Sequence, residues 1–411
     1  MRRDLVWRAV RFRRARRNRG VRWLLRVAWH RFLRPSLTPF LAPIAARKLA
    51  RAVRQHESRH WLVFVSTLDF NFPFQQRGHH LVRAFRRHGQ PVIFVTRAAG
   101  YDRVNLIAEL GGDLVLTPHR NAAIEAVPRP LVYFASTDAD VDARTLEQIQ
   151  NRGGRIIYDY VDLLDDRLST GPLSDARRQV HHDLLADDSA ICIGTAERLF
   201  EEVAACRQRN FALVTNGVDV GHFTVARSPT GLRADFAGVV ARQQPIIGYF
   251  GALARWVDYD LVIGLAKRRP KYSIVLIGPD TDGSVMELSG LPANLHVLAP
   301  FDYEDLPRHA VWFDTGLIPF VINEVTDATS PLKLFEYMAL GVPVVSTDLR
   351  ECRRYSSVAI ARTLDELIVL VDRGVERHGD LLHTRALAKA AAENDWLLKA
   401  QSILELVDRA S

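Results

Sequence analysis

From Trp61 onward, short apolar runs alternate with segments in which apolar residues recur every three or four positions. The runs are typical of buried strands, and the periodic segments are typical of amphipathic helices. Such alternation indicates βαβ units and a parallel sheet. In the first half we predict strands at Trp61–Ser66, Pro91–Thr96, Leu131–Ala135, Arg155–Asp162, Ala190–Ile193 and Ala212–Val214, separated by helices such as Gln75–His88, Asp142–Arg152 and Ala196–Ala205.

A second alternating series follows a stretch of mixed polarity, residues 224–244, which we interpret as a linker. Its predicted strands are Pro245–Phe250, Tyr272–Ile277, Leu295–Leu298, Thr315–Pro319 and Pro343–Ser346, and its helices include Asp258–Arg268, Tyr303–His309, Pro331–Leu340 and Asp365–Arg373. From Asp380 to Arg409 the pattern is that of a helix.

The length of 411 residues suits two or three domains rather than one core. We predict an α/β fold with two Rossmann-like doubly wound domains, residues 61–223 and 245–379, that face each other across a cleft. Residues 1–60 form a basic N-terminal extension, and residues 380–411 a C-terminal helix that packs back toward the first domain. Doubly wound domains bind ligands outside the carboxyl ends of their strands, so the cleft is the expected site.

One helix of the second half has the start of an anion-binding site. Ser330 as the N-cap and Pro331 at the first helical position form a favourable helix start, which places Lys333 at the third position. Free backbone N–H groups and a lysine at a helix start suit a diphosphate. Glu336 shares a face with Lys333 and could accept hydrogen bonds from ribose hydroxyls. The alternative is an ordinary surface ion pair, worth about 0.2–0.5 kcal/mol.

This region resembles bacterial glycosyltransferases of the GT-B fold, and most nearly family 4 and its relatives that build surface polysaccharides. The matching segments are Asp-Thr-Gly-Leu-Ile-Pro-Phe at 314–320, Asn-Glu at 323–324, Ser-Pro-Leu-Lys-Leu-Phe-Glu-Tyr at 330–337 and Gly-Val-Pro-Val-Val-Ser-Thr at 341–347. The resemblance is strong over residues 245–350, extends more weakly from Trp61 to the C-terminal helix, and does not cover residues 1–54.

The resemblance implies a nucleotide-sugar donor site at these positions. Glu336 matches the second glutamate of the family's paired motif, which holds the donor ribose. Lys333, Ser330 and Thr329 match positions near the donor diphosphate. The family's first glutamate would fall at Ala328, so the usual contact to the donor sugar is missing here. Some relatives with the Pro-Leu-Lys-Leu-Phe-Glu-Tyr form also lack it, so the departure concerns the subfamily more than the class.

Two further segments resemble parts of the family's donor domain. Gly251 follows a predicted strand at the position of the family's glycine turn, where a missing Cβ lets backbone approach a phosphate. Arg255 is the nearby candidate for a basic pair that family members often carry. Pro300 and Phe301 follow another predicted strand, where relatives hold the nucleobase against backbone.

Candidate acceptor-side and catalytic residues lie in the first half. Asp159 and Asp162 stand at the carboxyl end of a predicted strand, where a base could reach an acceptor hydroxyl, although an acid there could equally cap the next helix. Asp69, Arg77 and His79 lie around the start of the first predicted helix, which should face the cleft. The histidine could equally be an ordinary helix residue.

The charge of the chain is distributed unevenly. The net charge is +8, but residues 1–54 hold 17 Lys+Arg and one acid, which leaves the rest of the chain at −8. These basic residues alternate with Trp and Phe, and residues 21–33 have the apolar period of an amphipathic helix. No apolar run reaches the roughly 18–20 residues of a membrane-spanning helix. An anionic membrane surface, a nucleic acid, and a solvated extension without a partner are the alternatives.

The resemblance implies a glycosyltransferase that moves a sugar from a UDP- or GDP-sugar to a glycan or lipid-linked acceptor in cell-surface polysaccharide synthesis. The resemblance implies retention of anomeric configuration, and the missing glutamate leaves inversion with Asp162 as base open. We predict no metal, no cofactor and no nucleic-acid partner, and contact with an anionic membrane surface through residues 1–54. The alternatives are a sugar-nucleotide epimerase of the same fold and a non-catalytic membrane-surface protein. Three widely spaced cysteines favour a cytoplasmic location, and the basic residues 1–54 favour a peripheral position on the inner face of the membrane.

Overall fold

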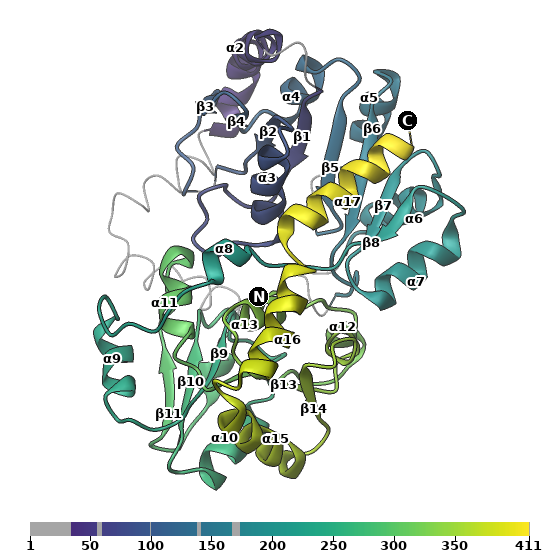
Figure 1. The fold of residues 1–411 in the computed structure, drawn as a ribbon. Helices are drawn as coiled ribbons and strands as arrows, with labels where there is room; N and C mark the ends of the chain where they lie inside the picture. The colour runs from purple at the N-terminus through teal and green to yellow at the C-terminus, as the bar shows by residue number, and fades with distance from the viewer. Residues whose placement is uncertain (1–33, 56–59, 99, 138–140, 167–172, 411) are drawn as a thin grey trace, which may run out of the picture.

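The computed structural model describes residues 34–55, 60–98, 100–137, 141–166 and 173–410. Figure 1 shows two α/β domains stacked end to end, each with a central sheet and helices on both faces. The predicted fold class, two Rossmann-like doubly wound domains, is confirmed. The amphipathic helix predicted at residues 21–33 lies outside the described residues.

The first domain is built on an eight-stranded sheet with the order β3-β4-β2-β1-β5-β6-β7-β8. All neighbours pair in parallel except β3, which runs antiparallel to β4. The strands are β1 (Leu62–Val65), β2 (Val92–Val95), β3 (Ala108–Leu110), β4 (Leu114–Thr117), β5 (Leu131–Ala135), β6 (Arg155–Tyr160), β7 (Ile191–Gly194) and β8 (Phe211–Leu213). Strands β3 and β4 were not predicted from the sequence. Strand β3 has only three residues and is largely exposed.

The second domain is built on a six-stranded parallel sheet with the order β11-β10-β9-β12-β13-β14. Its strands are β9 (Ile246–Phe250), β10 (Ser273–Ile277), β11 (Leu295–Leu298), β12 (Thr315–Ile318), β13 (Val344–Thr347) and β14 (Val358–Ala361). The first five lie within two residues of the predicted bounds. Strand order reverses beside β9, whose carboxyl end is therefore the expected binding edge.

Helices cover both sheets. They are α2 (Arg34–Arg54), α3 (Arg77–Arg87), α4 (Arg120–Ala126), α5 (Ala143–Asn151), α6 (Asp175–Ala186), α7 (Glu197–Cys206), α8 (Val220–Phe223), α9 (Ala234–Val240), α10 (Tyr259–Arg268), α11 (Leu306–Ala310), α12 (Glu324–Asp327), α13 (Leu332–Ala339), α14 (Arg350–Arg353), α15 (Leu364–Arg377), α16 (Leu381–Ala392) and α17 (Trp396–Arg409), with 3₁₀ turns η2 (Ser284–Glu287) and η3 (Tyr303–Asp305). The predicted linker holds a helix, α9. The single C-terminal helix that the sequence predicts is two helices.

Those two C-terminal helices connect the domains. Helix α16 packs against α13 of the second domain, whereas α17 packs against α3 of the first, as Figure 1 shows. Trp396 at the start of α17 stacks on His80 of α3 with ring centres 5.2 Å apart. The chain therefore crosses between the domains twice, once before α8 and once between α16 and α17. The two crossings pair with each other, because the N–H of Val218 donates to the carbonyl of Asn394 over 3.0 Å.

A buried polar network lies at the first crossing. Arg77, at the start of α3, makes a two-pronged ion pair with Asp159 of β6, with N···O distances of 2.7 and 3.2 Å. The two side chains are only 5% and 1% exposed, and Tyr133 of β5 also donates to Asp159. The remaining arm of the guanidinium donates to the carbonyl of Thr215 over 2.9 Å and to the Asn216 side chain. One arginine therefore joins a strand, a helix and the crossing chain.

The network continues into the second domain. The N–H of Asn216 donates to the Ser330 hydroxyl over 3.1 Å, and its side-chain amide donates to the Ser330 carbonyl. On the other side of the crossing, the Lys399 ammonium donates to Thr215 and Asn394 over 2.8 and 2.7 Å. The loop that leads into α13 is thus attached directly to the crossing chain.

A second set of interdomain contacts consists of ion pairs nearer the surface. Arg350 of α14 contacts Glu197 over 3.0 Å and Glu201, both on α7 of the first domain. Arg354 reaches Glu197 over 3.4 Å. The Glu201 side chain is 52% exposed, so solvent and salt weaken these pairs and they contribute little to stability.

We expect Asp159→Asn to lower the free energy of unfolding by about 3–5 kcal/mol, because it leaves the Arg77 charge buried without its partner. Urea unfolding of the variant measures this loss. The matched control is Asp113→Asn, which removes the half-exposed partner of Arg86 on the same helix and should cost about 1 kcal/mol or less. Equal losses in the two variants would contradict the proposed importance of the buried pair.

Candidate functional site

The predicted anion-binding helix is α13, and its start differs from the prediction by one residue. Pro331 is the N-cap, with an extended backbone (φ −68°, ψ 120°), so Lys333 is the second helical residue rather than the third. Ser330 does not cap the helix, because its hydroxyl accepts the hydrogen bond from Asn216 instead. Lys333 nevertheless lies in the first turn, where backbone N–H groups are free to bind an anion.

Lys333 is held between two aromatic rings. Its ammonium lies 5.1 Å from the ring centre of Tyr249 and 4.8 Å from that of Phe320. Tyr249 lies near the carboxyl end of β9, and Phe320 lies just beyond the end of β12. Burial lowers the pKa of Lys333 to about 8, and the neighbouring Glu336 opposes this shift. The half-buried side chain is therefore a partly desolvated cation at neutral pH, which suits it to a phosphate ligand.

Gly251 makes room for this lysine. A Cβ at Gly251, where φ is +136°, would lie 3.0 Å from the Lys333 Cε and 3.3 Å from its Nζ. A Cβ at Gly278 would in turn lie 1.7 Å from the Gly251 carbonyl. The two glycines therefore let the carboxyl ends of β9 and β10 meet beside the start of α13. The structure thus brings Gly251 and Lys333 together, as the resemblance implied.

Glu336 lies one turn farther along α13. The residue is 7% exposed, and within the described residues its carboxylate receives no hydrogen bond. Burial raises the pKa of Glu336 to about 7, against the opposing charge of Lys333. A buried carboxylate without a donor is ready to accept hydrogen bonds from a ligand, which fits its predicted role toward a ribose.

Aromatic residues around the helix were not predicted as part of the site. The Tyr337 hydroxyl accepts a hydrogen bond from the N–H of Phe250 over 3.3 Å and donates to carbonyls of the neighbouring strands, so it anchors α13 on the sheet. Tyr249 and Phe320 form the walls around Lys333. The signal in the sequence was an aromatic residue at or just beyond a strand end, which is too common to single out these two.

The loop before α13 has a structural role in this conformation. The Thr329 hydroxyl donates to the carbonyl of Thr326 over 2.7 Å, and the residue is half-buried. Ala328, the position of the missing glutamate, is fully buried and belongs to the apolar cluster of the first domain. This position therefore supports the contact between the domains and offers no polar group to a sugar.

The predicted nucleobase loop is fixed from one side by Arg233 at the start of α9. Its guanidinium donates to the carbonyls of Ala299 and Pro300 over 2.8 and 2.9 Å. The same group lies 3.9 Å from the ring centre of Phe301, which stacks at 3.9 Å on His309. The Phe301 ring is enclosed and only 9% exposed, so the predicted contact at this loop stays one made through its backbone. A base could meet only the backbone here.

Arg255 lies in the loop after β9 and is exposed. Its N–H donates to Asp282 over 3.0 Å, which ties this loop to the one after β10. Among the described residues, no group of three or more His, Cys, Asp or Glu side chains could hold a metal ion.

Two predicted acceptor residues have structural roles. The Asp69 carboxylate accepts hydrogen bonds from the backbone N–H groups of Gly100, Tyr101 and Asp102, and the residue is 3% exposed. His79 is 2% exposed, accepts from the N–H of Gln76 and contacts the carbonyl of Asp69, while burial lowers its pKa. Both residues fix the loop before α3, so their prediction as direct substrate contacts is corrected.

Arg77 and Asp159 require the same correction. Each is the other's ion-pair partner within the buried network at the crossing. Asp159 accepts from three donor atoms, so it is not free to act as a base. The sequence could not show this pairing, because the two residues are 82 positions apart.

Asp162 is the one predicted catalytic residue of the first domain that stays accessible. It follows β6, at the carboxyl edge of the first sheet, and is half-buried. Burial and then the charge of Asp159 raise its pKa to about 6. A carboxyl group with this pKa can exchange a proton near neutral pH.

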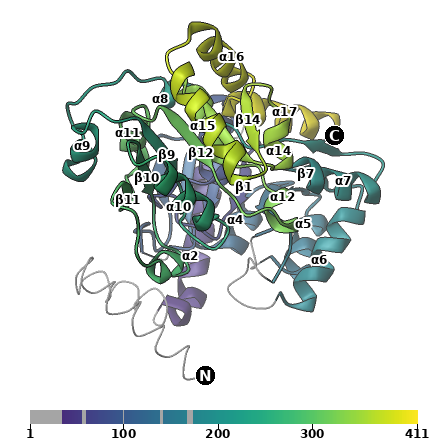
Figure 2. The same cartoon turned by 90° about the horizontal axis from the view of Figure 1, so that it is seen from below.

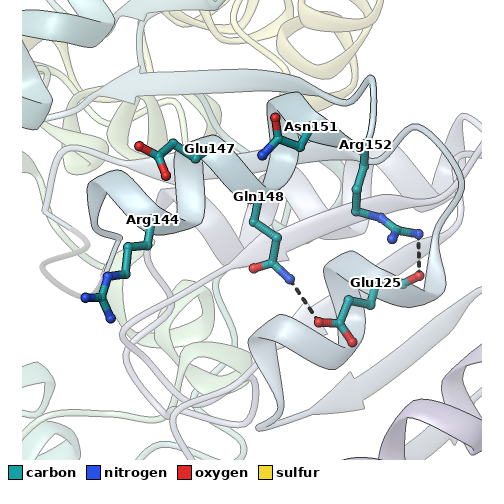
Figure 3. Close-up of a pocket in the computed structure, with 6 residues that line it drawn as sticks. All are labelled: Glu125, Arg144, Glu147, Gln148, Asn151 and Arg152. Atoms are coloured by element: carbon teal, nitrogen blue, oxygen red, sulfur yellow. Dashed lines mark hydrogen bonds between the residues drawn. The ribbon is translucent and has the colours of Figure 1, made fainter.

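A hollow on the first domain does not belong to this site. Figure 3 shows a depression of about 520 Å³ between α4 and α5, lined by Glu125, Arg144, Glu147, Gln148, Asn151 and Arg152. Gln148 donates to Glu125 over 3.1 Å within it. Both helices end there and lead into β5 and β6, so the hollow lies toward the amino ends of the strands. It is a solvated groove between two polar helices.

Comparisons with known proteins concern the whole chain. No model of a known protein family matches the chain. A putative teichuronic acid biosynthesis glycosyltransferase of Bacillus subtilis, TuaH, is 25% identical over 260 residues, which cover 59% of this chain and 64% of that protein. The alignment therefore spans less than two thirds of this relative.

Solved structures match over a larger part of the chain. HepE of Anabaena, in complex with UDP and glucose, matches with a TM-score of 0.63 and 15% identity over 85% of this chain and 100% of that one. Sucrose-phosphate synthase of Thermosynechococcus elongatus matches with a TM-score of 0.63 and 15% identity over 85% and 99%. At these identities the likeness concerns the fold. The chain therefore has the GT-B glycosyltransferase fold, as its sequence resemblance implied.

Proposed function

We propose that the protein transfers a sugar from a UDP- or GDP-sugar to a glycan or lipid-linked acceptor in cell-surface polysaccharide synthesis. The observation that carries the proposal is the partly desolvated Lys333, held between Tyr249 and Phe320 at the start of α13 and beside Gly251. A diphosphate fits this arrangement. The similarity to TuaH, named for teichuronic acid biosynthesis, and to HepE with bound UDP and glucose supports the same class of reaction.

The chemistry follows from where charge develops. Glycosyl transfer passes through an oxocarbenium-like state while negative charge grows on the departing diphosphate. Lys333 and the free N–H groups of α13 are already oriented toward that charge, so the protein need not reorganise during the reaction. Glu336 would hold the donor ribose. The reaction as proposed uses neither a metal nor a cofactor, because the cation is supplied by the chain.

Asp162 is the residue we assign to the acceptor side. It comes from the first domain, at the carboxyl edge of its sheet, and its pKa of about 6 suits proton transfer at neutral pH. The resemblance favours a retaining reaction, in which Asp162 would orient the acceptor hydroxyl. In an inverting reaction it would be the general base.

Two other functions remain testable alternatives. A sugar-nucleotide epimerase of this fold would turn over the donor without any acceptor. A non-catalytic membrane-surface protein would show no donor turnover. We also propose that the protein is cytoplasmic and reaches the inner face of the cell membrane through its basic residues 1–54. No helix in the described ranges is both long and apolar enough to cross a membrane.

We expect UDP, GDP or their sugars to raise the melting temperature, and a ligand at about 100 times its Kd adds roughly 2.7 kcal/mol to the free energy of unfolding.

Lys333→Ala should lower kcat by about a hundredfold or more, since one lost hydrogen-bond donor to a developing anion costs roughly 2.7–4 kcal/mol. Glu336→Ala should chiefly raise KM for the donor. The control is Lys389→Ala, an exposed lysine on α16. Unchanged kinetics in both site variants, or no stabilisation by any nucleotide, would remove the proposed site.

Donor affinity should have a bell-shaped dependence on pH. Lys333 is charged below its pKa of about 8, so affinity falls as pH rises above this value. Glu336 becomes a carboxylate above its pKa of about 7, so affinity also falls as pH drops below it. Titration calorimetry from about pH 5.5 to about pH 9.5 measures both limbs, which belong to the pair rather than to either residue. Lys333→Arg should remove the alkaline limb and Glu336→Gln the acidic one. A flat profile for the unmodified protein would contradict this assignment.

We expect the product to retain the anomeric configuration of the donor, which NMR of the purified product determines. Asp162→Asn should then lower kcat with little change in donor KM, because the residue acts on the acceptor side. An inverted product together with loss of activity in Asp162→Asn would instead make this residue the general base.

A further inference from the structure

Helix α2 presents an outward stripe of unusual composition. Its buried residues, Ala45, Leu49, Ala52 and Val53, face the first domain, where the helix packs against α4. Six exposed residues follow one another at steps of three, four or one, which places them on one side of the helix. They are Phe40, Ile44, Arg47, Lys48, Arg51 and Arg54. We call these six residues the α2 stripe.

The stripe combines exposed apolar and cationic side chains. Phe40 is 74% exposed and Ile44 is 45% exposed, although both are large apolar side chains that usually lie inside. Four cations follow them along the helix. Residues 34–54 contain no acid, so no carboxylate on the helix neutralises this charge.

This combination fits an anionic lipid surface. Large apolar side chains enter the boundary between headgroups and acyl chains, while Arg and Lys stay at headgroup level. Each cation near an anionic leaflet adds to binding. A second copy of the chain fits poorly, because two identical stripes would bring eight positive charges together. A nucleic acid would not require an exposed isoleucine.

The geometry points to the α2 stripe as the surface through which the protein docks on an anionic bilayer. This helix differs from the one that the sequence predicted at residues 21–33, so the proposal locates the contact on a described, packed element. Figure 1 shows α2 at the end of the first domain farthest from the second, and Figure 2 shows it at the edge of the molecule. The contact would therefore anchor the acceptor-side domain and leave the donor domain free to move.

The inference rests on the proposed function in one respect, because a lipid-linked acceptor gives the docking its use. The binding itself can be tested separately. Sedimentation of the full chain with vesicles of phosphatidylcholine and phosphatidylglycerol, compared with pure phosphatidylcholine, measures the partition coefficient. We expect binding only to the anionic vesicles, with a marked decrease at high salt.

Arg47→Ser/Arg51→Ser should lower the partition coefficient by about thirtyfold, the effect of two cations lost from an anionic surface. Phe40→Ser/Ile44→Ser should lower it by about tenfold or more through lost apolar insertion. These side chains are exposed, so both variants should fold, which circular dichroism checks.

The chain offers matched controls on its donor domain. Leu381 and Leu382 at the start of α16 are 72% and 77% exposed, and Arg373 and Arg377 are exposed on α15. Leu381→Ser/Leu382→Ser and Arg373→Ser/Arg377→Ser should change the partition by less than about twofold if α2 is the docking surface. Equal losses in the stripe and control variants would overturn the proposal.

Other outcomes also decide the question. Unchanged vesicle binding in both stripe variants, binding to DNA but not to vesicles, or lipid-free self-association that the stripe variants abolish would each reject the α2 stripe as a lipid-docking surface. Nucleotide-dependent melting should be the same in all variants. A chain that binds vesicles through the stripe but is stabilised by no nucleotide would keep this inference and remove the proposed transferase function.

Discussion

The ion pair between Arg77 and Asp159 is the constraint on which the arrangement of the two domains depends. A buried arginine needs a partner for its charge and acceptors for its remaining N–H groups. Asp159 supplies the first from the end of a strand, and Thr215 and Asn216 supply the second from the crossing chain. Because Asn216 also donates to Ser330, the position of the loop before α13 follows from the pair. The donor helix is thus set relative to the first domain by one guanidinium.

The properties of the proposed donor site follow from its surroundings, which partly exclude water from its charged groups. Lys333 is half-buried and carries its charge among aromatic rings and beside glycine backbone. Burial disfavours the charged form, which explains the lowered pKa of the lysine and the raised pKa of Glu336. An incoming diphosphate would stabilise the cation, and ribose hydroxyls would donate to the carboxylate. The shifted pKa values of Lys333 and Glu336 and the proposed affinity for a nucleotide sugar therefore have the same physical origin.

Sequence patterns predicted the elements well and the roles of polar residues less well. Strand β5 was predicted to the residue, because buried parallel strands are continuous apolar runs. Strand β11 was also predicted to the residue, although it is a half-buried edge strand that contains His296. Lys333 and Gly251 were found through helix-start chemistry and a strand-end glycine. Arg77 and Asp159 were assigned to substrate because pairing between residues far apart in sequence leaves no local signal. Ser330 was predicted to cap the helix, because its contact with Asn216 also joins residues that are far apart in sequence.

The contacts between the domains differ in strength, and this difference has a functional consequence. Near the crossing the polar groups are buried and fully paired, so this region should stay intact during any domain motion. Farther out, Arg350 meets Glu197 and Glu201 at half-exposed positions, where ion pairs are weak and easily screened. The domains can therefore part at the rim and remain joined at the crossing. Under the proposed function, such parting would admit a donor to the start of α13 without breaking the buried network.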